Sequence, residues 1–303
     1  WIYIASSSRK GRRVCASHGD RIFTGLHPGS KKERLTIMCN NERIYVDLHV
    51  LQTVPPSCVN RDDTGSPKTA VYGGVTRARV SSQAWKHAMR LQFRDMLSQE
   101  DVGQRTKTVV DLIAEQVAVL CPDCTEKQAQ DAAKKVLEAA GVKVKEDKDK
   151  LKTGALFFIS PSQVHALAEI AARQEKAPNK AECQDALKAN PSLDLALVGR
   201  MVADNPCLNF DAAAQVAHAI STHAVENEFD YFTAVDDCAP EDNAGAGHLG
   251  TVEFNSSTLY RYATVNAGDL KKMLGTAAPE AVRAFAEAFI RSMPTGHARM
   301  RCM

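Results

Sequence analysis

Residues 43–51, with the sequence Arg-Ile-Tyr-Val-Asp-Leu-His-Val-Leu, alternate between apolar and polar side chains. An alternation with period two is typical of a strand that is buried on one face. The side chains that would face the core are Ile44, Val46, Leu48 and Val50. Pro55 and Pro56 follow, and because proline has no backbone N–H to donate, we expect the strand to end near Val54.

A helix is predicted from the Ser81–Ser82 pair, either of which is a suitable N-cap, to about Leu97. The apolar stripe that should face the core is Trp85, Met89, Phe93 and Met96 or Leu97. A second face carries polar and cationic residues at intervals of three and four: Gln83, Lys86, Arg90 and Arg94. Cations at this spacing repel one another, so an anionic partner would stabilise this face.

The next hundred or so residues show the periodicity of helices, which predicts an inserted helical block. The predicted helices cover 108–120, 125–140, a segment after Ser160-Pro161, and 180–189. The charged run 142–152 is expected to be a loop. Alternating leucines after Pro191 indicate renewed strands, and 214–222 is compatible with a strand or a helix. A mostly polar segment at 226–257 follows. A strand is predicted at 260–266 and a helix at 279–292.

The chain has 303 residues, which suits two domains or one elaborated domain. Apolar residues make up 44% and charged residues 24%, so a wholly disordered chain is excluded. No apolar run is long enough to span a bilayer, and an odd number of scattered cysteines, 9 in all, is typical of a reduced, cytoplasmic protein without a membrane partner. Residues 1–37 lack sustained periodicity, and we interpret them as a non-native leader before an initiator at Met38; a genuine basic nucleic-acid-binding arm is the alternative.

The net charge of only +2 conceals a basic segment. Residues 60–94 contain 7 Lys and Arg against 2 Asp and Glu. Its cations are Arg61, Lys68, Arg77, Arg79, Lys86, Arg90 and Arg94. Side chains so placed are able to converge on a polyanion backbone, where binding depends on charge neutralisation. A solvated basic face is the alternative interpretation.

Other motifs are weaker indications of chemistry. Cys121-Pro-Asp-Cys124 has the spacing of half a zinc site or a redox pair, but a turn between helices explains it as well. Gly73-Gly74 is interpreted as a tight turn, because it lacks the ending of a phosphate-binding P-loop. A metal site is conceivable among residues that follow no recognised ligand spacing: His218, His223, Asp236, Asp237, His248 and Glu253. No cofactor is expected.

Several motifs in order resemble the CasC family, the backbone subunit of the type I-E CRISPR surveillance complex, Cascade. The resemblance extends from about Arg43 to Thr295. The first block of motifs is Leu48–Leu51, Pro56–Asp63, Lys68–Gly74 and Arg79–Gln83, with Lys86 and Ala88–Arg90. The second block is Ala196–Met201, Ala217–His223, Asp230–Asp237, His248–Gly250 and Tyr260–Ala263.

This resemblance implies an α+β fold: an RRM-like, ferredoxin-like palm with a helical finger insertion and a β-hairpin thumb. The implied division is palm at 38–91, finger at 92–190, palm at 191–224, thumb at 225–257 and a truncated palm at 258–303. It further implies a non-catalytic subunit that binds CRISPR guide RNA and stacks into a filament with copies of itself, alongside other Cascade subunits and the target DNA strand.

Residue by residue, the resemblance places guide contacts at Arg61, Lys68, Ser81, Gln83, Lys86, Arg90 and Met201. It places thumb contacts with guide or target at Tyr231, Phe232, Thr233 and Leu249. An aromatic pair in a thumb is able to stack on unpaired bases, and packing between stacked subunits is the alternative.

Two departures from the family pattern are the leader and the segment after Gly296, where the family's sequence continues differently. We interpret the latter as a frameshift. Two other functions are alternatives: a metal-dependent ribonuclease built on His223, Asp236, Asp237 and His248, and a nonfunctional truncated remnant of the backbone subunit.

Overall fold

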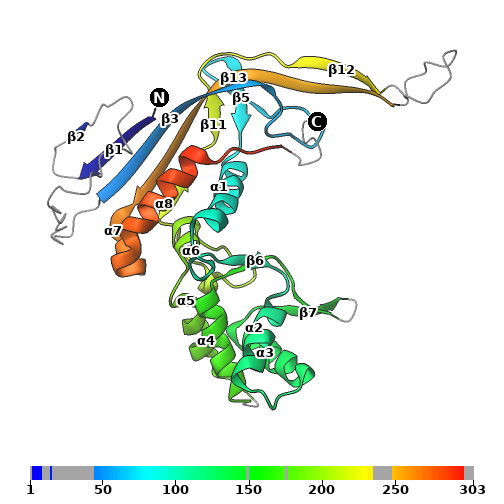
Figure 1. Cartoon of the computed structure of the whole chain (residues 1–303), viewed down its shortest axis with the longest axis vertical. Helices are drawn as coiled ribbons and strands as arrows, with labels where there is room; N and C mark the ends of the chain where they lie inside the picture. The colour runs from blue at the N-terminus through cyan, green and yellow to red at the C-terminus, as the bar shows by residue number, and fades with distance from the viewer. Residues whose placement is uncertain are drawn as a thin grey trace.

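The protein is described from a computed structural model that covers residues 2–8, 14–15, 44–147, 150–174, 177–234 and 248–296. An open antiparallel sheet carries helices on one face, and a second helical block lies beyond them (Figure 1). The predicted α+β class is confirmed. None of the helices in the described ranges is both long enough and apolar enough to cross a membrane.

Two long strands form the centre of the sheet. β3 (Ile44–Ser57) pairs with β13 (His248–Asn266) along most of its length, with Tyr262 opposite His49. The strand order is β2-β1-β3-β13-β11-β5-β4, and β10 and β12 also pair with β13. The remaining bounds are β1 (Ile2–Ser8), β2 (Val14–Cys15), β4 (Thr69–Tyr72), β5 (Val75–Val80), β10 (Ala214–Val216), β11 (Ala219–Ser221) and β12 (Glu228–Ala234).

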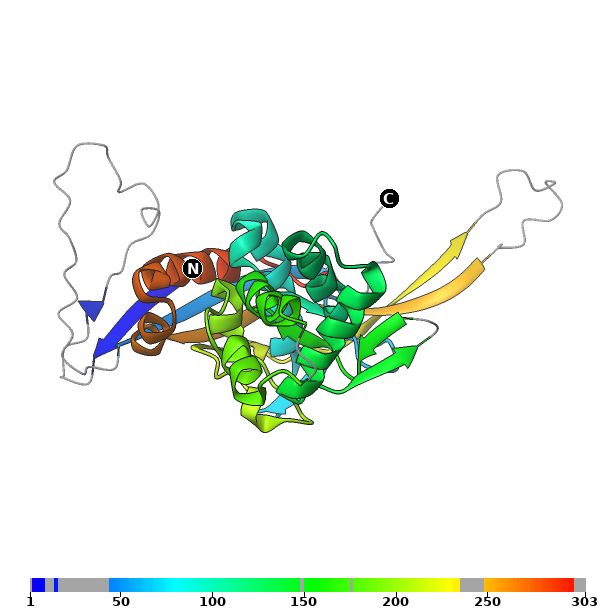
Figure 2. The same ribbon diagram turned by 90° about the horizontal axis from the view of Figure 1, so that it is seen from below.

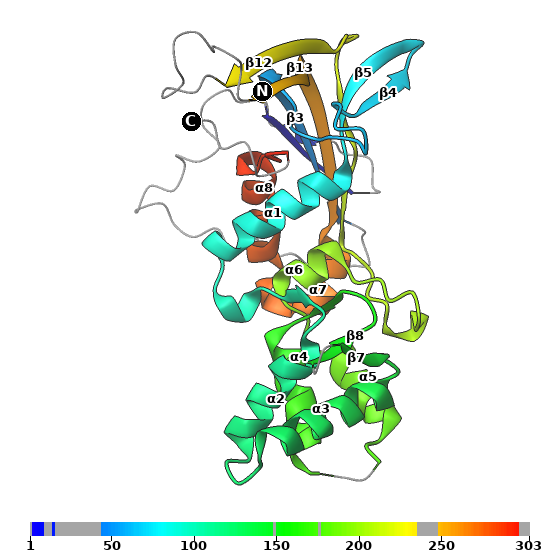
Figure 3. The ribbon, with the colours of Figure 1, turned by 90° about the vertical axis from the view of Figure 1, so that its right-hand side faces the viewer.

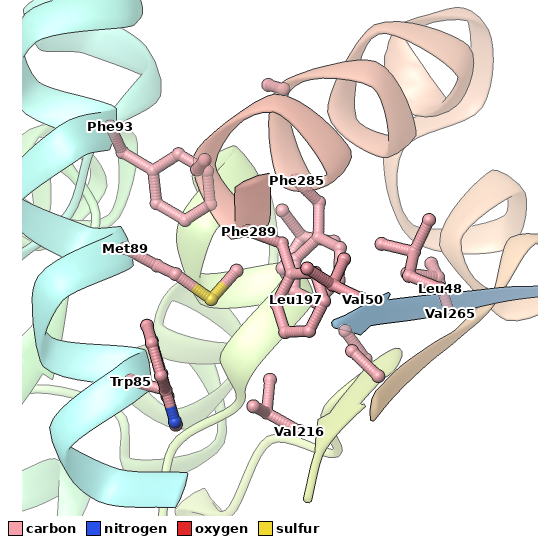
Figure 4. Packing of buried hydrophobic residues seen from close by; sticks show 14 of the residues in the cluster. Leu48, Val50, Trp85, Met89, Phe93, Leu197, Val216, Val265, Phe285 and Phe289 are labelled. Atoms are coloured by element: carbon pink, nitrogen blue, oxygen red, sulfur yellow. The ribbon is translucent and has the colours of Figure 1, made fainter. Parts of the chain in front are cut away.

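The first hydrophobic core lies between this sheet and the helices on it. α1 (Ser82–Met96) and α8 (Ala278–Arg291) cross the sheet with apolar side chains facing inward, as Figure 4 shows. The predicted stripe of α1 is confirmed: Trp85, Met89 and Phe93 are at most 1% exposed. The predicted face of the first strand is confirmed by buried Leu48 and Val50. α6 (Leu193–Val198) and α7 (Ala267–Leu274) complete this layer.

The second core belongs to the helical block. Its helices α2 (Val109–Leu120), α3 (Glu126–Ala140), α4 (Pro161–Ala172) and α5 (Lys180–Lys188) lie within one or two residues of the predicted bounds. Caps explain these limits, because Thr125 and Ser160 each form a capping box. The strands β6 (Gln104–Thr106) and β9 (Phe157–Ile159) pair at the side of the block that faces α1. Figure 3 shows the block below the sheet and its helices.

Three predictions about local structure were wrong. First, β3 continues through Pro55 and Pro56 to Ser57. The register shifts at these prolines: between the pairs Val54–Ser257 and Ser57–Asn255, both prolines lie opposite the single residue Ser256 of β13. Proline is tolerated at such a bulge because the ladder hydrogen bonds are interrupted there.

Second, the charged run predicted as a loop contains a hairpin, β7 (Val144–Asp147) and β8 (Lys150–Thr153). Val144 and Leu151 pack against the helical core, and this anchors a segment that is otherwise charged. Third, the alternating leucines after Pro191 form the helix α6, not a strand. Since nearly every residue of α6 is buried, its apolar residues show no readable period.

Residues 2–8, within the segment interpreted as a leader, form β1 against the edge of β3, with Ile4 opposite Leu48. An unpaired edge of a sheet offers free backbone groups to any extended segment. Residues 214–222, which were compatible with a strand or a helix, contain two short strands, β10 and β11. The palm, finger and thumb boundaries and the RRM-like assignment remain predictions.

Candidate nucleic-acid interface

One asparagine joins the loop after β3 to the start of α1. The backbone oxygen of Asn60 accepts from the Lys68 N–H at 2.9 Å, and its side-chain Oδ1 accepts from the Ser81 N–H, also at 2.9 Å. The Arg79 N–H in turn donates to the Lys68 oxygen at 2.8 Å. These bonds bring the loop that carries Arg61 and Lys68 beside the first turn of α1.

The loop itself is closed by a turn around Asp62. Its Oδ1 accepts from the backbone N–H of Thr64 at 2.9 Å, from the Thr64 hydroxyl at 2.7 Å and from the Ser66 N–H at 3.0 Å. These hydrogen bonds, the Thr64 side chain first, lower the pKa of Asp62. This carboxylate is engaged within its own loop and does not pair with Arg61 or Lys68. The Arg61 guanidinium donates through Nη1 to the Gly65 oxygen at 3.4 Å.

On α1, the residues of the predicted polar face differ in their exposure to solvent. Gln83 is exposed and Lys86 half-exposed, and both lie on the first turns of the helix. Ser81 is the N-cap: its hydroxyl accepts from the Ala84 N–H at 3.3 Å and its residue is 6% exposed. The hydroxyl of Ser81 therefore stabilises the helix start, and its predicted guide contact remains a prediction.

Arg90 lies at the junction between α1 and the helical block. Its guanidinium stacks over the Phe158 ring, with 4.5 Å from Cζ to the ring centroid. Burial lowers the pKa of Arg90, and the nearby carboxylate of Asp194 opposes that shift. Asp194 is itself buried and accepts from the Gly103 N–H at 2.8 Å and from Ser192 at 2.7 Å. Arg90 thus has a packing role in addition to the predicted guide contact.

The two cations of β5 border the same region. Arg79 donates through Nε to the Thr69 oxygen at 3.1 Å and lies 3.5 Å from Nδ1 of His218. Arg77 donates to the backbone oxygens of Tyr72 and Ser221 at 3.0 and 2.9 Å. Gly73 and Gly74 form the tight turn predicted for them, with positive φ angles of 66° and 80° between β4 and β5.

Met201 lies apart from this cluster on the segment after α6. It is 84% exposed. The preceding residue, Arg200, anchors the segment by donating to the backbone oxygens of Leu208, Phe158 and Leu187. An apolar side chain this exposed on a fixed segment is suited to contact with a partner.

The predicted thumb region contains a hairpin made by β12 and the first part of β13. It projects well beyond the helices, as Figure 2 shows. Tyr231, Phe232 and Thr233 lie on β12, and Thr233 pairs with the backbone position of Leu249 on β13. The side chain of Leu249 and residues 235–247 lie outside the described part of the chain.

A hydrogen-bond network ties the base of this hairpin to the loop beside α1. Glu253 accepts from the Ser66 hydroxyl at 2.8 Å through Oε1 and from the Asn227 amide at 3.0 Å through Oε2. Asn255 donates to Asn227 at 3.2 Å. The loop that carries the cations and the projecting hairpin are therefore physically connected.

Sequence reasoning missed three residues of this arrangement. Asn60 and Glu253 act through tertiary hydrogen bonds, which leave no local pattern in the sequence. Phe229 is absent from the predicted site, although the structure leaves it 69% exposed on β12. Its position two residues before Tyr231 is the signal that could have found it, because alternate residues of a strand share a face.

The weaker candidates for a metal site do not form one among the residues that the structure describes. Both ring nitrogens of His223 have backbone partners, the Ala224 oxygen at 2.9 Å and the Thr258 N–H at 3.2 Å. Within the described residues there is no group of three potential metal ligands; Asp236, Asp237 and the side chain of His248 lie outside them. Cys121 and Cys124 lie in the turn between α2 and α3, as the simpler interpretation predicted.

A family model and chains of solved complexes are similar to this protein. A family model described as "CT1975-like protein" matches residues 46–300. A chain of a solved "CRISPR RNA-guided surveillance complex, pre-nicking" is similar, with a TM-score of 0.71 and 35% identity over 83% of this chain and 73% of that chain. A chain of another "CRISPR RNA-guided surveillance complex" gives a TM-score of 0.63 and 31% identity, with the same coverage. A search of curated proteins found no match.

Proposed function

The chain belongs to the CT1975-like family of Cas proteins, and on this premise we propose that it is a guide-RNA-binding backbone subunit of a Cascade-type surveillance complex. The solved chains that it resembles come from RNA-guided surveillance complexes, which supports a CRISPR guide RNA and the other Cascade subunits as its partners.

The observation that carries this proposal is the cationic cluster around the start of α1. Asn60 holds the loop of Arg61 and Lys68 beside the helix that carries Lys86. Among the ion pairs that join described residues, none includes these three cations. Unpaired cations on a rigid scaffold are suited to RNA phosphates, which release counterions when they are bound.

In this proposal the subunit has no catalytic role. Copies stack into a filament along the guide, phosphate contacts fix the RNA, and base pairing reads the target DNA strand, a division of labour known for RNA-guided effectors. The hairpin of β12 and β13 acts as the thumb at the guide–target duplex. Assignment to the type I-E subtype belongs to the same proposal.

The test is co-expression of the full chain with a CRISPR guide, followed by purification of bound RNA and titration of its affinity against salt. Lys86→Ala is expected to weaken binding for every guide sequence and to lower the salt slope by about 0.7 logarithmic units, the value for one lost single-strand phosphate contact. Lys180→Ala is the control, because Lys180 is exposed on α5 in the helical block.

An unchanged salt slope in both Lys86→Ala and Lys68→Ala would contradict the phosphate assignment. The scaffold role predicts that the purified protein leaves the guide intact with and without a chelator. Guide cleavage that a chelator abolishes would instead identify a metal-dependent ribonuclease.

A further inference from the structure

The two cysteines of the Cys121-Pro-Asp-Cys124 motif lie at the ends of one tight turn. Cys121 ends α2, where its N–H donates to the Val117 oxygen at 2.8 Å. The Cys124 N–H donates to the Cys121 oxygen at 3.0 Å and closes the turn. Pro122 occupies the second position, where proline fixes the backbone of such a turn. Because Thr125 caps α3 directly afterwards, two packed helices hold the turn in place.

This turn brings the two sulfur atoms together. The Cα atoms at the ends of such a turn are less than about 7 Å apart, and disulfides join cysteines whose Cα atoms are about 4.4–6.8 Å apart. The thiol of Cys124 donates to the sulfur of Cys121, with 2.7 Å between the two Sγ atoms. This hydrogen bond raises the pKa of Cys124. The backbone therefore needs little change for a bond to form between the two sulfurs.

The side chain of Gln174 holds the pair in its reduced form. Gln174 follows the C-cap of α4, and its Nε2 donates to Sγ of Cys124 at 2.7 Å and to Sγ of Cys121 at 3.7 Å. The φ angle of Gln174 is 54°, in the left-handed region that few residues other than glycine and asparagine adopt. Hydrogen bonds to the thiol sulfurs stabilise the reduced pair and make its oxidation less favourable.

The pair is open to small molecules in solution. Cys121 and Cys124 are both half-buried, whereas Cys183 in the same helical block is fully buried. Redox-sensing cysteines are accessible to solvent and lie beside a second cysteine that resolves the first oxidation product. The accessibility of this pair and its spacing both fit that pattern.

We propose that Cys121 and Cys124 form a reversible dithiol–disulfide site whose oxidant is a low-molecular-weight disulfide. Because Cys124 is the donor in the contact between the sulfurs, the Cys121 thiolate attacks first. It breaks the S–S bond of the small disulfide, forms a mixed disulfide and releases one small thiol, which takes up a proton. Cys124 then loses its proton and attacks the Cys121 sulfur, which forms the protein disulfide and releases the second small thiol. Two protein thiols are oxidised and one small disulfide is reduced to two thiols.

This site goes beyond the proposed role in guide binding and lies apart from the cationic cluster. The helices α2 and α4 both begin beside β6 and β9, the strands that face α1, and the helical block extends away from the sheet (Figure 1). The turn after α2 and Gln174 after α4 are therefore at the far ends of these helices. Because the two regions are separate, the redox site can fail while guide binding is retained, and the reverse.

The site is tested on the full chain in buffers that contain reduced glutathione and an increasing proportion of glutathione disulfide. Free thiols are then blocked with N-ethylmaleimide, and peptides are identified by mass spectrometry. We expect an increasing fraction in which Cys121 and Cys124 are joined and carry neither reagent, and dithiothreitol should restore both thiols. Cys207, which is exposed on the short helical turn Pro206–Leu208, is the control and should carry at most one glutathione.

Three variants separate the steps. Cys124→Ser should stop the reaction at a mixed disulfide between Cys121 and glutathione. Gln174→Asn keeps a residue that tolerates a positive φ but shortens the amide, so it should raise the ratio of disulfide to dithiol about two- to tenfold in one buffer, the range for one hydrogen bond. Pro122→Gly should lower this ratio about two- to fivefold, because glycine gives the reduced turn more conformations.

N-ethylmaleimide on both cysteines in every buffer, or glutathione on each without a bond between them, would overturn the site. An unchanged ratio in Gln174→Asn would overturn the role of Gln174. Circular dichroism of the wild type should show the same helix content before and after oxidation. A disulfide that forms only with loss of helix would belong to the unfolded chain, and this result also overturns the proposal.

Discussion

Arg261 is a fully buried arginine that stacks between two aromatic rings. Its guanidinium lies 3.6 Å from the Trp85 ring centroid and 4.5 Å from that of Phe289, and it donates to Gln52 at 2.7 Å and to the Phe289 oxygen. Burial lowers the pKa of Arg261 to about 9. The Tyr-Arg-Tyr-Ala motif that resembles the family therefore includes a residue that packs in the core between the sheet and the helices.

Asp194 provides a prediction about pH. Burial raises its pKa, so the folded protein holds this proton at pH values where the unfolded chain has lost it. This contribution to the free energy of unfolding is fully present below the ordinary aspartate pKa of 3.8 and is lost as pH rises through the folded-state pKa. Asp194→Asn removes it, so the stability of the variant relative to the wild type should rise between about pH 4 and pH 7.

Denaturant unfolding at the two pH values measures this difference. A stability difference that is the same at both would show that Asp194 has an ordinary pKa in the folded state. The opposite trend would show that its pKa is lowered, as in an ion pair.

At the scale of elements, the long strand β13 belongs both to the central sheet and to the projecting hairpin. Its second half is the centre of the sheet, its first half is one side of the projecting hairpin, and the irregularity between Asn255 and Ser257 separates them. Glu253 lies just before this irregularity and accepts hydrogen bonds from Ser66 and Asn227.

We therefore predict that Glu253→Ala loosens the loop and the hairpin together. Losing hydrogen bonds to a carboxylate should raise amide hydrogen exchange in residues 61–68 and 228–233 by about tenfold or more. Glu228→Ala, which changes an exposed acid on the same hairpin, is the control. If exchange increased in the hairpin but not in the loop, the proposed coupling of the two would be wrong.

At the scale of the whole molecule, two separate hydrophobic clusters support the chain. One joins the sheet to α1, α6, α7 and α8, and the other lies within the helical block. Arg90 stacked on Phe158 is one of the contacts between them. Separate cores favour separate cooperative units of unfolding.

This arrangement predicts that core cavities act locally. Leu167→Ala should cost about 2–5 kcal/mol in the helical block, and Phe289→Ala about 3–5 kcal/mol under the sheet. Native-state hydrogen exchange should show lost protection mainly in the cluster that was changed. Equal loss in both clusters after either substitution would indicate a single cooperative unit.

The sequence alone determined the elements that have a readable period and clear caps. The strand after Arg43, the stripe of α1 and the four helices of the block were predicted within a few residues, because side-chain periodicity and capping are local properties. The basic segment was likewise visible in the order of charges.

Only the tertiary structure decided what depends on partners distant in sequence. Asn60 and Glu253 connect the parts of the candidate interface through hydrogen bonds. Arg90, predicted on the basic face, stacks on Phe158. The buried segment 193–198 forms the helix α6. The physical reason is that hydrogen bonds, stacking and complete burial arise between segments far apart along the chain, and no local pattern records them.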